Sequence, residues 1–192
     1  MTVVALIRVT NIQIIMAKKN HVPDFKKLAE SLKHKAARIA GSESVKFFKE
    51  SFVKQGFTDT SFEAWLKTQN PLAGKRTMYK SGKLMQSIRK TEETTKRVTV
   101  IADSDYAEIQ NSGGYIVVTL KMKNFFWAKH IEFKDKNKKK AEFCKAMALK
   151  KEGDKIKIPP NKFIGNSQTL LNILKEQFEV ELHTAFKQRL NA

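Results

Sequence analysis

Residues 79–114 constrain the fold more than any other stretch, because they prescribe turns and a strand within a short length of chain. A Ser-Gly-x-Leu-x-x-Ser-Ile box at 81–88 opens with turn chemistry: a side chain that bonds back to the backbone, then a residue free to take a positive φ. Leu84 and Ile88 are four residues apart and would share one face of a helical turn. The alternating, β-branched run at 97–102 predicts a strand. The residues that follow the box, which include this strand, are therefore expected to resemble a hairpin.

The stretch ends with a second motif, Tyr-Ala-Glu-Ile-Gln-Asn-Ser-Gly-Gly at 106–114. Tyr106, Ala107 and Ile109 are spaced to pack a short turn. The double glycine that follows predicts a tight bend, since glycine tolerates backbone angles that other residues avoid. Residues 115–120 are rich in β-branched side chains and predict a strand that leaves this bend.

A third motif, Ile-Pro-Pro-Asn-Lys-Phe-Ile-Gly at 158–165, precedes the last helical pattern. Together, the three motifs and the strand resemble the phage virion morphogenesis family, the tail-completion proteins of Mu-like phages and prophages. The resemblance spans roughly residues 25–186 and rests on the order and spacing of the motifs. Gln110 stands where many members have histidine, and Asn-Lys at 161–162 where many have arginine before the phenylalanine. The matching positions are Ser81, Gly82, Leu84, Ser87, Ile88, Tyr106, Ala107, Ile109, Gly113, Phe163, Ile164 and Gly165.

The resemblance implies a structural role in virion assembly. Members of this family act at the head-proximal end of the tail, where the tail is completed and joined to the head, and they act by protein–protein binding. The implied partners are tail and neck (head–tail connector) proteins, and a ring of identical copies is one assembly that such a joint allows. The implied locations are the virion and, during assembly, the cytoplasm of the bacterial host.

The chain is strongly basic, with 37 Lys and Arg against 19 Asp and Glu and a formal net charge of +18. Such a balance favours a polyanionic neighbour, although a lysine-rich solvated surface gives the same composition. Lysine lacks the forked guanidinium that reads base edges, so any DNA contact is expected with the backbone. The charge is densest at five candidate contacts to a polyanion or a partner: Lys134, Lys136, Lys138, Lys139 and Lys140.

The competing hypothesis is a non-specific nucleic-acid-binding protein that uses these basic loops and an aromatic cluster. Lysines and aromatic residues are interleaved at 121–130, and exposed rings on a basic surface are what single strands bind. Phe125, Phe126 and Trp127 are consecutive, however, and cannot all lie on one side of a helix. At least one of them is therefore expected in the core. A metal-dependent nuclease is disfavoured, because acidic residues and histidines do not cluster in the sequence.

Two long amphipathic patterns flank the motifs. An apolar stripe over residues 25–52 continues through Gly41 without losing phase and so predicts one long helix. A second stripe begins at Leu171 and runs towards the C-terminal end, with Asn166 as the expected cap. Alternation at 155–158 predicts an edge strand with its lysines outward. The predicted fold class is α+β: a small, mainly antiparallel sheet flanked by a long N-terminal helix and a long C-terminal helix.

Two further segments lie between these helices. Residues 57–69 hold a shorter pattern with Phe62, Trp65 and Leu66 on one face, which predicts a second, short helix. The region at about 121–154 mixes aromatics, a lysine run and a short helical pattern, and we expect it to be an insertion relative to shorter members of the family. Both segments interrupt a simple order of helix, strands and helix.

Residues 1–16 are apolar and β-branched, and we interpret them as an extension or an optional N-terminus. Arg8 interrupts the run, which is also shorter than the about 20 apolar residues of a membrane span, so no membrane contact is expected. Residues 17–192 are expected to form a single domain. The one cysteine, Cys144, excludes an internal disulfide, and four scattered histidines do not suggest a zinc site. No common catalytic or cofactor motif is present, so neither an enzyme nor a cofactor is expected.

Overall fold

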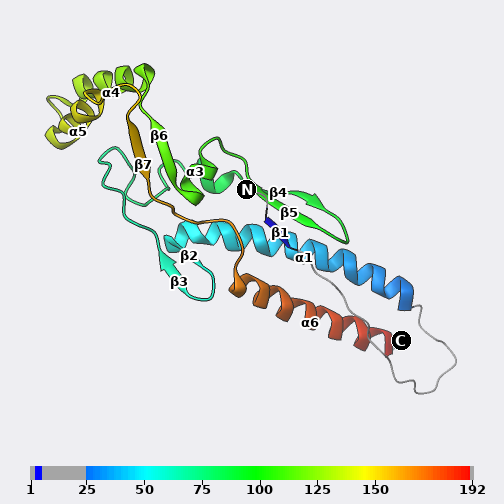
Figure 1. The fold of residues 1–192 in the computed structure, drawn as a ribbon. Coiled ribbons are helices and arrows are strands. Elements are labelled where there is room, and N and C mark those ends of the chain that lie inside the picture. Colours follow the sequence, from blue (N-terminus) through cyan, green and yellow to red (C-terminus); the bar gives the residue numbers. More distant parts are fainter. Residues whose placement is uncertain (1–2, 6–24, 191–192) are drawn as a thin grey trace.

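The computed structural model describes residues 3–5 and 25–190, with two long helices at one end and a helical hairpin at the other (Figure 1). Most of the predicted extension at 1–16 lies outside the described residues. The predicted α+β class is confirmed, with small antiparallel sheets and long N-terminal and C-terminal helices. In order, the elements are β1 (Val3–Ala5), α1 (Phe25–Lys54), β2 (Gly56–Thr58), β3 (Phe62–Ala64), α2 (Lys83–Gln86), β4 (Ile88–Glu93), β5 (Val98–Ala102), α3 (Ala107–Ser112), β6 (Gly114–Val117), α4 (Leu120–Phe133), α5 (Lys138–Ala148), β7 (Lys155–Ile158) and α6 (Gln168–Leu190).

The described strands form three small antiparallel sheets rather than a single one. β5 lies between β1 and β4, β2 pairs with β3, and β6 pairs with β7. The predicted strand at 97–102 is β5, and β4 and β5 form the predicted hairpin, with a bulge between Lys90 and Glu92. The predicted edge strand at 155–158 is β7, which pairs with β6 and leaves its other edge open among the described strands.

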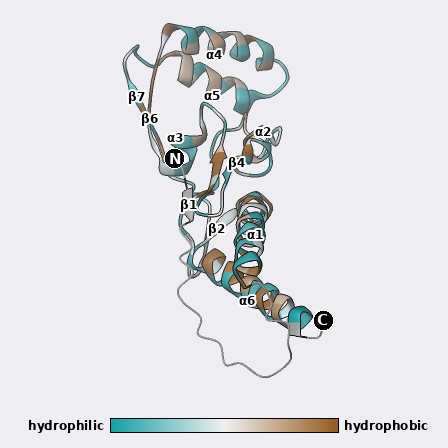
Figure 2. Cartoon of the chain, turned by 90° about the vertical axis from the view of Figure 1, so that its right-hand side faces the viewer, coloured by the Kyte–Doolittle hydropathy of each residue, from teal (hydrophilic) through white to brown (hydrophobic). Residues whose placement is uncertain are grey.

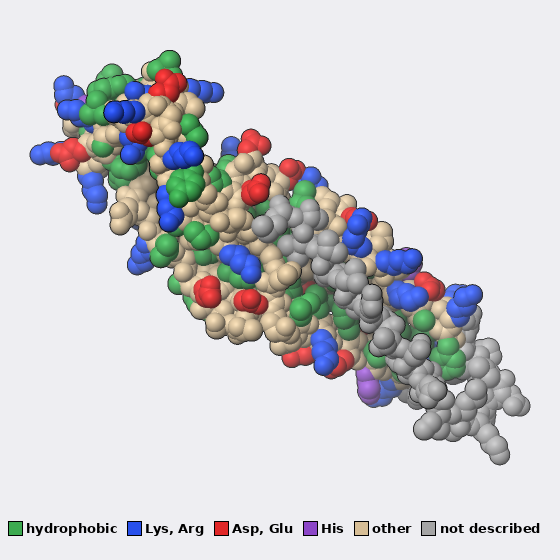
Figure 3. Space-filling model, viewed as in Figure 1, with side chains coloured by type: hydrophobic (Ala, Val, Ile, Leu, Met, Phe, Trp, Pro, Cys, Tyr) green, Lys and Arg blue, Asp and Glu red, His purple; other side chains and the backbone are tan. Residues whose placement is uncertain are grey.

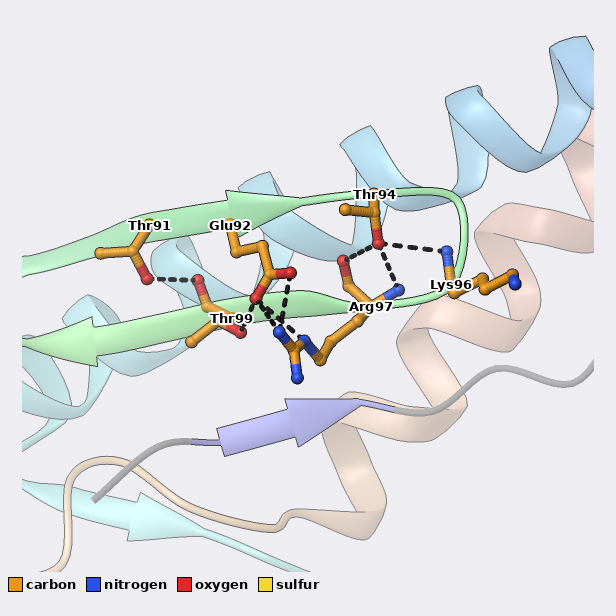
Figure 4. Close-up of polar contacts among 6 residues, drawn as sticks. All are labelled: Thr91, Glu92, Thr94, Lys96, Arg97 and Thr99. Carbon is orange, nitrogen blue, oxygen red and sulfur yellow. Dashed lines mark hydrogen bonds and ion pairs between the residues drawn. The ribbon is translucent and has the colours of Figure 1, made fainter.

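A cluster of polar side chains fixes the turn of the β4–β5 hairpin (Figure 4). Arg97 donates from Nε to Glu92 Oε2 at 2.9 Å and from Nη2 to Glu92 Oε1 at 2.8 Å. The bond from this guanidinium holds the pKa of the Glu92 carboxyl below its usual range. Thr94 Oγ1 accepts the backbone N–H of Arg97 at 2.9 Å, which closes the turn. Contacts of this kind pin the register of a short hairpin.

α1 runs unbroken through Gly41, as predicted, and its buried face combines Leu28, Phe48 and Phe52 of the predicted stripe with several small residues. At Gly41 a Cβ atom would lie 2.5 Å from Cδ of the flexible Lys90 side chain and 3.4 Å from Val98 Cγ1, so the β4–β5 hairpin packs against the helix at this point. A hydrophobic stripe does not reveal such a face, because small residues contribute little to the apolar pattern. The buried small residues are Ala37, Ala40, Gly41, Ser44 and Ser51.

α6 packs beside α1 and runs in the opposite direction (Figure 1). Gly165, with a φ of 146°, ends the third motif just before the helix. The predicted cap Asn166 is wrong, since Ser167 Oγ accepts the N–H of Leu170 at 3.1 Å. The predicted start of the buried stripe is also wrong, because Leu170 is buried and Leu171 is exposed. Leu174 and Ala185 of the predicted stripe are buried, so the error is confined to its start.

The predicted helix at 57–69 is wrong, because the segment forms the β2–β3 hairpin. Gln55 follows α1 with a positive φ of 59°, which turns the chain away from the helix axis. Of the three residues expected on one buried face, Trp65 is buried, whereas Phe62 and Leu66 are exposed. Tertiary contacts of this hairpin override its local helical spacing.

The core of the described chain has two separate parts, which lie at different levels of the molecule (Figure 2). The larger part surrounds Phe52 and Phe163, between α1, the β4–β5 hairpin and the start of α6. The smaller part surrounds Phe126 and Cys144, between α4 and α5. We call residues 114–158 (β6, α4, α5 and β7) the arm, and the remainder of the described chain the body.

The arm contains the region at 121–154 that is expected to be an insertion. The predicted strand at 115–120 is too long, because β6 ends at Val117. Thr119 Oγ1 accepts the N–H of Met122 at 3.2 Å and so caps α4 at this point. None of the helices in the described part of the chain is long and apolar enough to cross a membrane.

Candidate functional site

The box at 81–88 makes a tight turn that leads into the core. Gly82 has a left-handed backbone (φ 74°) and precedes the single turn of α2. Leu84 and Ile88 are both buried, but Ile88 is the first residue of β4, so the two do not share a helical face as predicted. Ser87 Oγ donates to the backbone carbonyl of Leu84 at 2.8 Å. The box is therefore a turn that leads directly into the β4–β5 hairpin.

The second motif meets the third at Gly113. α3 forms the predicted short turn, in which Ala107 is buried, Ile109 is half-buried and Tyr106 is exposed. Gly113 has a φ of 73°, and a Cβ atom there would lie 2.8 Å from the backbone N of Pro160. Only glycine therefore lets the chain that leaves β7 pass so close to α3.

Asn111 ties the same two motifs together, although it is not one of the positions that match the family. It is 6% exposed, and its Oδ1 accepts the N–H of Phe163 at 2.9 Å and the N–H of Ile164 at 3.1 Å. The carbonyl of Gln110 accepts the N–H of Asn161 at 2.9 Å in the same place. The sequence gives one indication of this role. Asn111 lies four residues after Ala107 and so on the same face of α3, where a buried polar side chain needs a hydrogen-bond partner.

We expect Asn111→Ala to lower the free energy of unfolding by about 2–3 kcal/mol, because two buried N–H groups lose their acceptor. Urea denaturation monitored by circular dichroism measures this change. The control is Asn166→Ala: its side chain is exposed and lies outside this network, so the expected change is within about 0.5 kcal/mol. Equal losses in the two variants would show that the Asn111 amide does not hold the motifs together.

The third motif is also bound to the β2–β3 hairpin. Trp65 Nε1 donates to the carbonyl of Lys162 at 2.7 Å, and Asn161 Oδ1 accepts the N–H of Leu66 at 3.2 Å. Lys162 Nζ lies 4.4 Å from the centre of the Phe57 ring, which is a cation–π distance. The second and third motifs and this hairpin thus form one structural unit, although their segments lie far apart in the sequence.

A groove of about 960 Å³ opens between the arm and the body. Ser81, Gly82 and Tyr106 of the first two motifs line it, together with residues 156–159 beside the third. A smaller hollow of about 500 Å³ adjoins the groove and shares Lys80 and other lining residues with it. Apolar side chains from distant segments line the groove, namely Leu66, Met78, Ile116, Met122, Phe126, Phe143 and Met147.

Positive charge borders the groove without an acidic counterpart. None of the described residues that line it is Asp or Glu. Arg76 is engaged within the body, because its Nη2 donates to the last carbonyls of α1, those of Phe52 and Val53. The remaining charged groups are exposed and give the rim a positive potential. They are Lys67, Lys80, Lys83 and Lys157.

The lysine run at 134–140 lies where α4 turns into α5. Lys134 follows the last residue of α4, where the helix dipole favours a cation. Lys138, Lys139 and Lys140 occupy the first turn of α5, where the dipole disfavours one. No lysine of the run forms an ion pair with a carboxylate of the described chain. Helix stability therefore does not account for the run.

The arm presents basic and apolar side chains together (Figure 3). Residues 114–158 contain thirteen lysines against five acidic residues. The three consecutive aromatics separate as predicted: Phe126 is buried in the smaller core, while Phe125 and Trp127 are exposed on α4. Ile131 of α4 is also exposed. Exposed apolar groups that are concentrated in one element are typical of a surface that binds a partner.

The described residues do not gather the groups that metal or thiol chemistry needs. They contain no set of three or more His, Cys, Asp or Glu side chains that could hold a metal ion. Cys144 is buried between α4 and α5, and burial raises the pKa of its thiol, which disfavours a nucleophilic thiolate.

No family model matches the chain, and no curated protein or solved structure is significantly similar to it.

Proposed function

We propose that this chain is a structural protein of a phage or prophage, which completes the tail and joins it to the head during virion assembly. It acts by binding tail and neck (head–tail connector) proteins, first in the cytoplasm of the bacterial host and then in the virion. The observation that carries the proposal is the physical contact between the motifs that resemble the virion morphogenesis family.

The second and third motifs lie far apart in the sequence, and the antiparallel pairing of β6 with β7 brings the end of one beside the start of the other, with Gly114 opposite Ile158. Here the second motif bonds directly to the third, through Asn111 to Phe163 and Ile164. Gly113 of the second motif admits the backbone of Pro160 in the third. The box lies across the groove from the same unit. This agreement between order in the sequence and contact in the fold supports the resemblance.

The arm is the part of the molecule best suited to the proposed joint. It places lysines and exposed apolar groups on an element that stands away from the main core (Figure 1). In a ring of identical copies the arm would be repeated around the axis, so that modest contacts add up to a stable joint. Its positive charge suits an acidic ring protein, or the DNA backbone at the point where DNA leaves the head.

Deleting the gene from an inducible prophage is expected to leave filled heads apart from unattached or overlong tails, as seen by electron microscopy. Complementation with the natural chain should restore intact virions. The charge-reversed variant Lys138→Glu with Lys139→Glu should restore them poorly, whereas the control Lys26→Glu with Lys187→Glu, on α1 and α6, should restore them fully. Intact, infectious virions from the deletion strain would reject the proposal.

A non-specific nucleic-acid-binding protein is the second candidate, and the exposed rings of Phe125 and Trp127 favour it. The two candidates differ in the partner that the purified chain binds. Affinity for single-stranded oligothymidine that falls steeply between low and moderate salt would favour the nucleic-acid role. Binding to a purified tail or neck protein, without affinity for oligothymidine at low salt, would favour the assembly role.

A further inference from the structure

We infer that the groove between the arm and the body binds a short acidic, amphipathic segment of a protein partner, with its apolar side chains on the groove floor and its carboxylates against the lysine rim. The inference deepens the proposed function, because it names the chemistry of the partner and rests on that function for the partner's biological role. The binding event itself can be measured with the purified chain alone.

The floor of the groove is suited to apolar side chains. Leu66 is 63% exposed on the body side, and Ile116 of β6 is also exposed, so apolar area faces solvent there. Three methionines, Met78, Met122 and Met147, line the floor and can adapt to side chains of different shape. The volume of about 960 Å³ is large enough to accept several side chains of a bound segment.

The rim selects for negative charge. Lys67 and Lys80 come from the body and Lys157 from the arm, and these three exposed lysines form no ion pair within the described chain. The adjoining hollow has no acidic lining residue and adds Lys140, which forms no ion pair within the described chain, and Lys129, which is paired with Glu132 at 2.6 Å. A segment that carries Asp or Glu on both sides of its apolar anchors would therefore meet lysines from both parts of the molecule.

Of the four aromatic rings that the described residues contribute to the lining of the groove, three are already in contact with other side chains and only Tyr106 is exposed, which favours a peptide over stacked bases. One face of the Tyr79 ring is covered by the Arg76 guanidinium, 4.7 Å from the ring centre. Phe126 and Phe143 pack edge-to-face against each other, with ring centres 6.1 Å apart. Base stacking needs open ring faces, whereas an aliphatic or thioether side chain needs only apolar area.

The test is fluorescence anisotropy with a labelled amphipathic peptide that places leucines on one helical face and glutamates on the other. The full chain is expected to bind it at least about tenfold more tightly than two control peptides, one with Gln for Glu and one with Ser for Leu. Equal affinity for the Gln peptide would overturn the acidic part of the inference. Tighter binding of oligothymidine, in competition for the same site, would assign the groove to nucleic acid instead.

A matched pair of variants places the binding in the groove. Leu66→Asp removes floor area and adds a repelling charge, and should weaken peptide binding by about tenfold or more. Val180→Asp is the control, since Val180 is 66% exposed on α6 and lies outside the groove. Leu66 is equally exposed, so neither change should affect folding, which circular dichroism checks. Identical peptide affinity in the two variants would overturn the inference.

The inference and the proposed function can fail separately. A deletion strain with separate heads and tails, combined with no peptide binding, would remove only the groove inference. Peptide binding that Leu66→Asp abolishes, combined with intact virions from the deletion strain, would keep the groove and remove the tail role.

Discussion

Replacing Phe163 with alanine is expected to lower the free energy of unfolding by about 3–5 kcal/mol. The side chain is 0% exposed, and its ring centre lies 5.2 Å from that of Phe52 in the middle of the larger core. Asn111 holds the backbone N–H of Phe163 in place, so the segment cannot easily move to fill the cavity. A site that cannot collapse loses more stability on truncation, which places the expected value towards the upper end of the range. Denaturation in urea, followed by circular dichroism, measures the change.

Phe62→Ala is the matched control for this prediction. Phe62 lies on β3 and is half exposed, so its truncation leaves no cavity in the core. Its expected cost is about 1 kcal/mol or less. If Phe163→Ala cost no more than this control, the third motif would not belong to the core. The contact between the second and third motifs, on which the proposed function depends, would then lose its energetic basis.

Long, regular patterns in the sequence predicted the elements that they describe. The stripe over 25–52 became α1, and alternation with outward lysines became β7, because repeated spacing outweighs any single residue. The run at 97–102 became β5 for the same reason. Errors at the ends of elements, such as the strand predicted to continue to Leu120, arose where a single cap decides the boundary.

Features that depend on distant contacts could not be predicted from the local pattern. The β2–β3 hairpin has helical spacing, but Trp65 bonds to a carbonyl of the third motif almost a hundred residues later. At Gly41 the helix α1 packs against side chains of Lys90 and Val98, which come from two strands about fifty residues further along the chain. Local periodicity carries no information about either contact.

The candidate site likewise has one part that the sequence predicted and one part that it did not. The lysine run at 134–140 was visible in the sequence, because like charges in a row need no fold to be recognised. The groove was not, because its lining comes from the loop around the box, from α4 and α5, and from the β6–β7 ribbon. Only the fold brings these segments together around one apolar floor.

Replacing Phe126 with alanine is expected to loosen the arm while leaving the body intact. Phe126 is 9% exposed and packs against Phe143 and the buried Cys144 in the smaller core, which is separate from the larger one. Loss of the ring should cost the arm about 3–4 kcal/mol of local stability. Amide hydrogen exchange should then become about 100–1,000-fold faster in α4 and α5, with little change in α1 and α6. Exchange followed residue by residue by NMR measures both regions in one sample.

Ile131→Ala is the control, because Ile131 lies on the same helix, is 71% exposed and lies outside the smaller core. Its truncation should leave the exchange rates of α4 and α5 nearly unchanged. An equal rise of exchange in α1 and α6 after Phe126→Ala would show that arm and body unfold as one unit, contrary to the two separate cores. If the arm does open alone, the groove loses one of its walls in the open state. Binding of an acidic segment across the groove would then slow exchange in α4 and α5, since a ligand that needs both walls stabilises the closed form.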